Sequence, residues 1–147
     1  MTSTRTEMAW MPADEYGRGL PRFTVNLLVR DVAAALPFYR DVLQAKVHYA
    51  DGDFAALELN GTAFMLHADH TYDHHPLYAR LGAAGPRGTG AELRVFGVDP
   101  DALEKRARAA GAKVLQPSMD FPHGWRDVML EDRDGYIWAI GLPLEGK

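Results

Sequence analysis

The chain has 147 residues, enough for one domain or for two small halves that share a hydrophobic core. Hydrophobic residues make up 47% and charged residues 24%, as in folded globular proteins, so we do not expect a disordered chain. A net charge of -4 gives no basic surface for nucleic acid or for an anionic membrane, and we expect neither as a partner.

Cysteine is absent, which excludes disulfide bonds and thiolate metal sites. No apolar run approaches the roughly 20 residues that a membrane helix needs. The start of the chain also lacks the continuous apolar centre of a signal peptide. Together these features predict a cytoplasmic protein.

Residues 1–21 precede the first predicted strand and are interpreted as an N-terminal arm. Charged residues are scattered through the arm, which also carries apolar side chains at Met8, Trp10, Met11 and Tyr16. Apolar groups on a polar segment tend to be covered in the folded state. We therefore expect the arm to pack on a partner subunit or on a sheet of its own chain.

Residues 22–68 are predicted to form a module of one strand, one helix and three further strands. β-branched and apolar residues indicate a strand over Phe23–Val29, after which Asp31 is placed to cap a helix. That helix contains Pro37, which we expect to bend it rather than to end it. Three strands then follow, over Lys46–Tyr49, Phe54–Leu59 and Thr62–His67, with the hairpin turn Asn60-Gly61 between the last two.

Residues 90–147 repeat this order as a second module. Ala91–Val98 is typical of a strand, Asp99-Pro100 begins a helix and Gly111 ends it. Three more strands are predicted, over Val114-Leu115, Trp125–Glu131 and Tyr136–Leu142. The offset between the modules is nearly the same at both ends of their helices, which indicates a duplicated unit.

Residues 69–89 are predicted to link the two modules. The stretch His67–His75 holds four of the six histidines, together with two carboxylates, but its spacing matches no zinc motif. We interpret it as a solvated loop or as a lid over the binding site, with a metal site as the alternative. His123, on a second loop, is expected at the same rim.

Three segments resemble a known family: Leu28–Asp31, Pro37–Leu43 and Leu130–Trp138. Together with the duplicated order of elements, they resemble the vicinal oxygen chelate superfamily, which includes glyoxalase, bleomycin-resistance and extradiol-dioxygenase proteins. Gln44 stands where that family has a glycine. The resemblance covers roughly Phe23 to Leu142. It implies an α+β fold in which two βαβββ modules form a curved mixed-sheet cup, with one helix per module packed outside.

In metal-dependent members of this family, four strands each supply one ligand to a metal in the cup. The resemblance assigns these positions to Thr24, to Met65 or His67, to Glu92 and to Ala139. Divalent metals prefer imidazole, carboxylate and amide oxygen ligands, and this set does not complete a coordination sphere. We therefore expect no metal, no other cofactor, and neither a glyoxalase I nor an extradiol-dioxygenase mechanism.

The alternation of side chains along each strand predicts which residues face the cup. The predicted lining combines aromatic and thioether side chains with a few polar groups, as small-molecule sites commonly do. It consists of Asn26, Met65, His67, Glu92, Arg94, Phe96, Trp125, Asp127 and Met129. Trp138 faces the opposite side and is assigned to the core with Phe38 and Tyr39.

The same residues also have structural interpretations. Glu92 and Arg94 lie two apart on one side of a strand and fit an ion pair, in which Asp127 can be a second partner of Arg94. His67 fits a histidine bonded to a backbone carbonyl as well as it fits a general base. The aromatic and thioether residues fit a hydrophobic core as well as a ligand wall.

The favoured interpretation is a protein that sequesters a hydrophobic or aromatic small molecule in the cup, as antibiotic-resistance proteins of the bleomycin-resistance type do. The main alternative is a metal-independent enzyme, of lyase or isomerase type, that transfers protons through His67, Glu92 or Asp127. A third interpretation is a metal-dependent glyoxalase or dioxygenase whose ligands are displaced to the histidine stretch. The resemblance also implies a homodimer.

Overall fold

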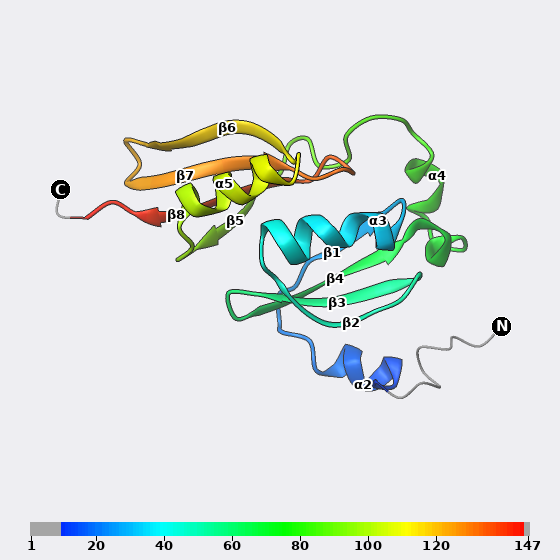
Figure 1. The fold of residues 1–147 in the computed structure, drawn as a ribbon. Coiled ribbons are helices and arrows are strands. Elements are labelled where there is room, and N and C mark those ends of the chain that lie inside the picture. The colour runs from blue at the N-terminus through cyan, green and yellow to red at the C-terminus, as the bar shows by residue number, and fades with distance from the viewer. Residues whose placement is uncertain (1–9, 146–147) are drawn as a thin grey trace.

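Each half of the chain folds as a strand, a helix and three strands in the computed structural model, which describes residues 10–145 (Figure 1). The first module contains β1 (Asn26–Val29), α3 (Val32–Pro37), η1 (Phe38–Val42), β2 (Lys46–Ala50), β3 (Phe54–Leu59) and β4 (Thr62–Ala68). The second contains β5 (Leu93–Phe96), α5 (Pro100–Ala109), β6 (Lys113–Asp120), β7 (Trp125–Glu131) and β8 (Ile137–Pro143). A short helix, α2 (Ala13–Arg18), precedes the first module.

The two modules form two four-stranded mixed sheets with the same topology. The strand orders are β1-β4-β3-β2 and β5-β8-β7-β6, and in each sheet the first strand runs parallel to its neighbour while the others are antiparallel. The predicted duplication and the α+β class are therefore confirmed. The described residues form two separate sheets rather than one continuous sheet, because β1 and β5 each have only one paired edge.

The first helix begins where the sequence predicts and changes from an α-helix to a π-helix after Pro37. The Asp31 carboxylate accepts a hydrogen bond of 3.1 Å from the backbone N–H of Ala34 and so caps α3. Pro37 ends the α-helical part, but the chain continues without a break as the π-helical turn η1. A proline that cannot donate to the helical ladder is accommodated by this change of pitch.

Residues with positive φ mark the turns. Asn60 and Gly61, with φ of 49° and 85°, form the predicted hairpin between β3 and β4. Gly111, with φ of 74°, ends the helix of the second module as predicted. Gln44 has φ of 58°, so the position at which the family has a glycine requires a left-handed conformation here.

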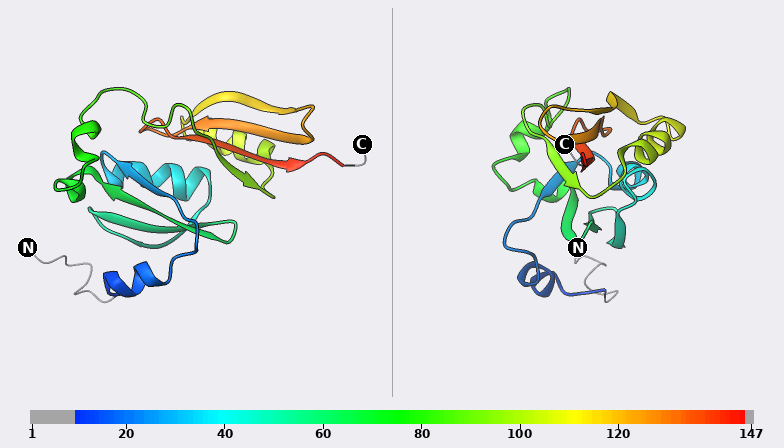
Figure 2. Two further views of the ribbon diagram at one scale, coloured as in Figure 1. Left: turned by 180° about the vertical axis from the view of Figure 1, so that it is seen from behind. Right: turned by 90° about the vertical axis from the view of Figure 1, so that its left-hand side faces the viewer.

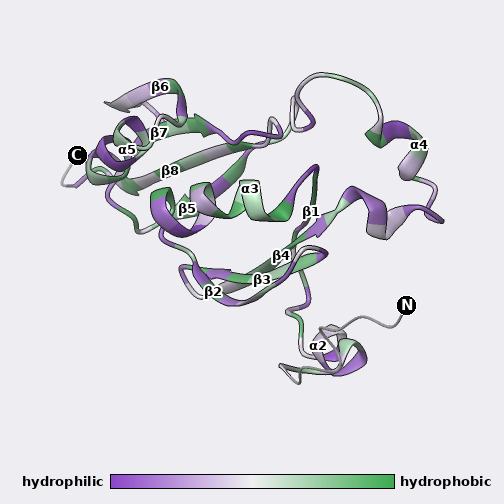
Figure 3. Cartoon of the chain, turned by 45° about the vertical axis from the view of Figure 1, so that its right-hand side comes forward, coloured by the Kyte–Doolittle hydropathy of each residue, from purple (hydrophilic) through white to green (hydrophobic). Residues whose placement is uncertain are grey.

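One hydrophobic core joins the modules. The helices α3 and α5 lie beside one another, each on one face of its own sheet (Figure 2), and the side chains between them form a single buried cluster. Hydrophobic residues accordingly gather in the strands of both sheets and in α3 (Figure 3). Tyr39, Phe38 and Trp138 belong to this cluster, which confirms their assignment to the core.

Two observed segments differ from the sequence prediction. Strand β6 extends to Asp120, well beyond the predicted Val114-Leu115, because it pairs with β7 along most of its length. Two register shifts interrupt this pairing and conceal the alternating pattern, and Pro117 is tolerated because β6 is an edge strand.

The linker is more ordered than its composition indicates. It contains a 3-10 turn, η2 (Asp69–Tyr72), and a short helix, α4 (Tyr78–Leu81). The guanidinium of Arg87 donates two hydrogen bonds of 2.7 Å to the Asp69 carboxylate and further bonds to the carbonyls of Leu28 and Leu81. These bonds fix the linker against the first module. Among residues 10–145, no helix is long and apolar enough to span a membrane.

Candidate functional site

Each sheet has a core face, which packs on the helices, and an outer face on the opposite side. On the first sheet the outer face carries Asn26, Leu28, Phe54, Ala56, Met65 and His67, because Asn26 pairs with Met65 and Leu28 with His67. On the second sheet it carries Arg94, Phe96, Trp125, Asp127, Met129 and Ala139. The side-chain alternation predicted from the sequence is the one observed, and each helix packs on the face opposite the predicted lining.

Charged side chains meet on the outer face of the second sheet. The guanidinium of Arg94 donates to Oε1 of Glu92 at 2.8 Å and to Oδ2 of Asp127 at 2.9 Å. Asp127 is 5% exposed, whereas the side chains of Arg94 and Glu92 are 37% and 43% exposed. Both ion pairs that the sequence interpretation allowed for Arg94 are present, and of the two carboxylates only Asp127 is buried.

A glycine on the neighbouring strand makes room for Asp127. A Cβ atom added at Gly141 would lie 2.7 Å from Cβ of Asp127 and would collide with the carbonyl of Arg126. Only glycine therefore allows β7 and β8 to approach this closely at the position opposite Asp127. The sequence reasoning did not identify Gly141, although a glycine inside a predicted strand commonly marks such an approach.

Aromatic side chains form a wall beside this charged group. Phe96 and Trp125 are in ring contact, and Cζ of Arg94 lies 4.8 Å from the centre of the Trp125 ring, a cation–π geometry. Phe96 is 49% exposed and Met119, on the same face, is 44% exposed. His123 lies at the rim, with Nε2 3.8 Å from Oδ2 of Asp127. The outer face of the second sheet is therefore open and largely apolar.

The outer face of the first sheet carries a chain of polar side chains. Nδ1 of His67 lies 2.7 Å from Oδ1 of Asn26, whose amide donates a 2.6 Å hydrogen bond to the hydroxyl of Tyr72. His67 is thus oriented by a side-chain amide, whereas the sequence suggested a backbone carbonyl as its structural partner. Tyr72 was not identified from the sequence, because it lies in the histidine stretch that was interpreted as a loop.

The rest of this first outer face is covered. Phe54, Ala56 and Met65 are buried in a small hydrophobic cluster, against which Trp10, Tyr16, Leu20 and Tyr49 pack. The predicted contact between the N-terminal arm and a sheet of its own chain is therefore present for Trp10 and Tyr16, while Met8 lies outside the described residues. Met65 consequently faces the arm rather than an open cup.

The predicted lining is divided into two groups. Asn26, Met65 and His67 lie on the first sheet and the remaining six residues on or beside the second. The hydrogen bond between His67 and Asn26 lies on the first outer face, and the ion pair between Arg94 and Asp127 lies on the second. The two groups stand on two separate sheets, and their convergence around one ligand stays a prediction.

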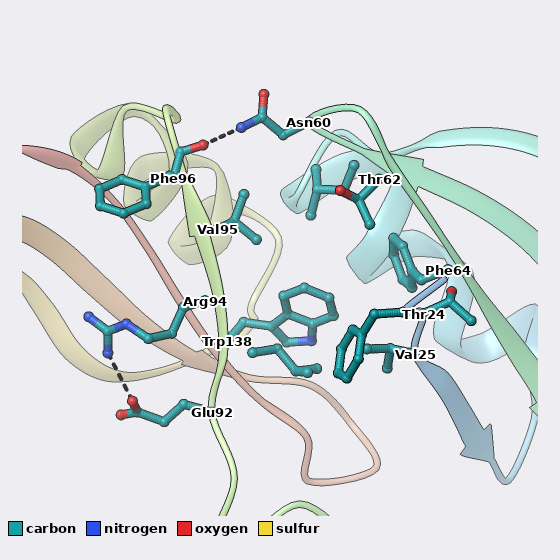
Figure 4. A pocket seen from close by; sticks show the side chains of 13 residues that line it. Thr24, Val25, Asn60, Thr62, Phe64, Glu92, Arg94, Val95, Phe96 and Trp138 are labelled. Carbon is teal, nitrogen blue, oxygen red and sulfur yellow. Dashed lines mark hydrogen bonds and ion pairs between the residues drawn. The ribbon is translucent and has the colours of Figure 1, made fainter. Parts of the chain in front are cut away.

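A cavity of about 510 Å³ lies between the two modules, where β1 and β5 face each other (Figure 4). Apolar and polar side chains both line it. It is lined by Phe23, Thr24, Val25, Leu59, Asn60, Thr62, Phe64, Glu92, Leu93, Arg94, Val95, Phe96 and Trp138. The side-chain amide of Asn60 donates to the carbonyl of Phe96 and closes one end. The cavity shares Glu92, Arg94 and Phe96 with the open face of the second sheet.

The four positions that hold the metal in related proteins do not fit a divalent cation here. The hydroxyl of Thr24 donates to the Ala63 carbonyl at 2.8 Å, and Glu92 is paired with Arg94. Ala139 offers a methyl group, and the remaining position is a thioether or a histidine that is bonded to Asn26. This donor set supplies too few imidazole and carboxylate ligands, and no chemical step is assigned to a metal.

The histidine stretch does not gather ligands either. Nε2 of His70 lies 2.7 Å from Oδ1 of Asp53, and His75 contacts the Tyr72 ring. In the part of the chain from residue 10 to residue 145, no three histidine or carboxylate side chains are grouped as a metal site would require. The stretch lies beside the first sheet as η2 and the turn that follows it.

Comparison with known proteins agrees with the fold. The model of the Glyoxalase/Bleomycin resistance protein/Dioxygenase superfamily matches residues 20–140. An uncharacterized protein of Mycobacterium bovis is 31% identical in an alignment of 133 residues that covers 84% of this chain and 84% of that protein.

Solved structures share the same architecture at lower identity. A glyoxalase/bleomycin resistance protein/dioxygenase from Nocardioides has a TM-score of 0.67 at 23% identity, covering 98% of this chain and 93% of its own. A lactoylglutathione lyase from Agrobacterium tumefaciens has a TM-score of 0.62 at 20% identity, covering 83% and 92%. The chain belongs to the glyoxalase/bleomycin resistance protein/dioxygenase superfamily.

Proposed function

We propose that this protein binds a hydrophobic or aromatic small molecule without a metal, on the outer face of the second sheet. The ligand lies on the wall formed by Phe96 and Trp125 and reaches toward the cavity between the modules. Arg94 and Asp127 contribute the polar contacts that orient it.

The observation that carries the proposal is the exposed aromatic wall beside a fixed charged group. Phe96 is half exposed although it is a large hydrophobic side chain, and Trp125 holds the Arg94 guanidinium 4.8 Å from its ring. Ligand sites combine apolar walls with a few oriented polar groups, and a flat apolar face left open to water favours an aromatic occupant. The ion pairs of Arg94 fix the guanidinium in place before a ligand arrives.

A metal-independent enzyme is the second candidate, and the observation that favours it is the orientation of His67. Its bond to Asn26 and the bond from Asn26 to Tyr72 hold the imidazole in one position, as a general base requires. The two carboxylate candidates are less suited, because Glu92 and Asp127 are both paired with Arg94. In a catalyst, His67→Gln should abolish turnover and leave binding nearly unchanged.

A homodimer is part of the proposal. The two outer faces are separate within one chain, so a second copy is needed if residues of both sheets are to contact one ligand. The exposed side chains of Phe23, Phe96 and Met119 give the chain an apolar surface that a partner subunit would cover.

The test is a thermal-shift screen of planar aromatic compounds, among them indole, quinoline and 2-naphthol, followed by calorimetry. A compound that binds only the folded protein must raise its apparent stability. Trp125→Ala should weaken the binding of a hit about thirtyfold, since a desolvated aromatic anchor contributes about 2 kcal/mol. Tyr78→Ala, which removes an exposed aromatic residue on α4, is the control and should leave affinity unchanged. Equal losses in both variants would contradict the proposal.

A further inference from the structure

The N-terminal arm covers the outer face of one sheet and leaves the other open. In Figures 1 and 2, α2 lies against the first sheet on the side away from α3. Beneath it, Phe54 is 3% exposed and Met65 is 7% exposed, whereas Phe96 on the second sheet is 49% exposed. Trp10, Tyr16 and Leu20 pack directly on the cluster of Phe54, Ala56 and Met65 and so contribute to its burial.

Trp10 covers the first outer face and lies there as a flat aromatic ligand would. The indole of Trp10 stacks on the ring of Tyr49, with centroids 5.1 Å apart and an angle of 14° between the planes. The ring centres of Tyr16 and Phe54 lie 5.3 Å and 6.4 Å from that of Trp10, both tilted against it. His67 follows 4.9 Å beyond Phe54. Aromatic rings therefore surround the planar indole of Trp10.

The hydrogen bonds of residues 10–20 are local to this segment. Among the described residues, the hydrogen bonds of residues 10–20 all end within this segment, for example from the Tyr16 backbone N–H to the Pro12 carbonyl and from Arg18 to Asp14. α2 has only six residues and no side-chain cap. Residues 10–20 thus contact the sheet through the apolar and aromatic side chains of Trp10, Tyr16 and Leu20.

One buried polar atom of the arm lacks a partner. The Tyr16 hydroxyl is enclosed without a hydrogen bond, and burial raises the pKa of this side chain. A buried hydroxyl with no acceptor costs free energy, which it recovers once the arm lifts and water reaches it. The closed arrangement is therefore less stable than its apolar contacts alone would make it.

We propose that the first outer face is a subsite for a planar aromatic group, and that Trp10 is an intramolecular occupant which such a ligand displaces. The subsite consists of Tyr49, Phe54, Met65 and His67, and residues 10–20 act as its lid. This inference rests on the proposed function in one respect, namely that the protein takes aromatic ligands. A tethered occupant competes at high effective concentration, so it lowers the apparent affinity for a free ligand.

Indole is the probe, because it is the group that Trp10 places on the first outer face. The full-length chain contains three tryptophans, Trp10, Trp125 and Trp138, so labelling with 5-fluorotryptophan gives three fluorine NMR signals that single variants assign. Titration of the wild-type protein with indole should move the Trp10 signal toward the value of a solvent-exposed residue. The Trp138 signal, from a side chain 4% exposed in the core, should stay in place.

Trp10→Ala supplies the second measurement. Removing the occupant should strengthen indole binding at the first outer face about tenfold or more, the factor expected when a site is occupied nine-tenths of the time by its own chain. Tyr78→Ala is again the control. An unmoved Trp10 signal at saturating indole, or an unchanged affinity in Trp10→Ala, would overturn the proposal that residues 10–20 act as a lid.

Failure of the lid and failure of the proposed function give different results. If Trp125→Ala abolishes all indole binding in both the wild-type and Trp10→Ala backgrounds, the second sheet is the ligand face and the lid is wrong. If Trp125→Ala has no effect while Trp10→Ala gains a site, the lid stands and the proposed location of the ligand is wrong.

Discussion

The hydroxyl of Tyr39 donates a 2.5 Å hydrogen bond to Oδ2 of Asp132 and so joins the helix of the first module to the β7–β8 turn of the second. The other carboxylate oxygen, Oδ1, accepts from the backbone N–H groups of Asp134 and Tyr136 and shapes that turn. The Arg30 backbone N–H and guanidinium donate to Asp134 nearby. Asp132 and Asp134 belong to Leu130–Trp138, one of the segments that resemble the family. This segment therefore also connects the two modules.

Tyr39→Phe should destabilise the fold by about 1–3 kcal/mol, because it leaves a buried carboxylate oxygen without its donor. The ring itself stays in the core, so packing is preserved. Urea unfolding measures the change. A loss below about 0.5 kcal/mol, the scale of ordinary surface substitutions, would show that the hydrogen bond does not hold the modules together.

Asp132→Asn should alter how stability depends on pH. Burial raises the pKa of Asp132 in the folded state, so the folded protein binds the proton more tightly than the unfolded chain does. The contribution of this group to stability is then complete below its unfolded pKa of about 3.9 and is lost as the pH rises through the raised value. The asparagine variant should therefore gain stability relative to wild type between pH 4 and neutrality.

The control for this experiment is Asp41→Asn. The Arg40 guanidinium holds the pKa of Asp41 below its usual range, so stability depends on pH in the opposite direction from Asp132. Stability from Asp41 is present above the unfolded pKa and is lost as the pH falls. Unfolding free energies measured for the three proteins at several pH values should diverge in opposite directions; parallel curves would contradict the assignment.

Gln44→Gly should stabilise the protein by about 0.5–1 kcal/mol. A side chain at φ of 58° is disfavoured by about 1–2 kcal/mol, and part of the gain is offset by the greater freedom of glycine in the unfolded chain. The melting temperature should rise by a few degrees at most. Asn60→Gly is the matched control at φ of 49°, and its gain should be smaller because asparagine tolerates this conformation. A destabilised Gln44→Gly would contradict the strain argument.

The duplicated fold could be predicted because it is encoded locally. Asp31 and Asp99 cap their helices, and the Asn60-Gly61 turn fixes a hairpin, so short-range chemistry repeated twice determines the order of elements. The alternation of side chains along β5 and β8 then predicts which of them face the core and which face outward. Arg94 with Asp127 on one face and Trp138 on the other follow from this period of two.

The arrangement of the two sheets could not be predicted in this way. Alternation predicts on which side of its strand His67 or Arg94 lies, but not how far apart the two sheets stand, so the sequence did not predict that these residues lie on two separate sheets. The covering of Phe54 by Trp10 also escaped prediction, because a contact between an arm and a sheet depends on tertiary packing rather than on local pattern. The aromatic content of the arm was the available signal.

Gly141→Ala should destabilise the second sheet by about 1–3 kcal/mol, as overpacking does, because the added methyl group would push β7 away at Asp127. The displacement should also separate Asp127 from Arg94 and weaken the binding of any ligand held beside Trp125. Gly82→Ala is the control, since nothing lies within 4 Å of a Cβ atom there. Unfolding and calorimetric titration of both variants measure the effect, and equal behaviour would contradict it.

The protein, purified without added ions and without a polyhistidine tag, should contain far less than one equivalent of zinc, nickel, manganese or iron. The physical reason is the donor set, in which Glu92 is paired with Arg94 and Thr24 donates to a backbone carbonyl. Elemental analysis by mass spectrometry measures the content. About one metal per chain that is lost in Glu92→Gln or His67→Gln would contradict this prediction, whereas loss in a His70→Ala, His74→Ala variant would assign the metal to the histidine stretch.

The chain, of 16.3 kDa, should form a dimer of twice that mass at micromolar concentration. The outer face of the second sheet exposes Phe96 and Met119, and an apolar face of this kind is commonly covered by a partner with two-fold symmetry. Met119→Lys places a charge on that face outside the proposed ligand wall and should shift the protein toward monomer. Leu77→Lys introduces the same charge at a residue 39% exposed on the linker, away from both sheets, and should leave the dimer intact. Light scattering coupled to size exclusion distinguishes the outcomes: a wild-type monomer would refute the dimer, and equal dissociation of both variants would show that the second outer face is not its interface.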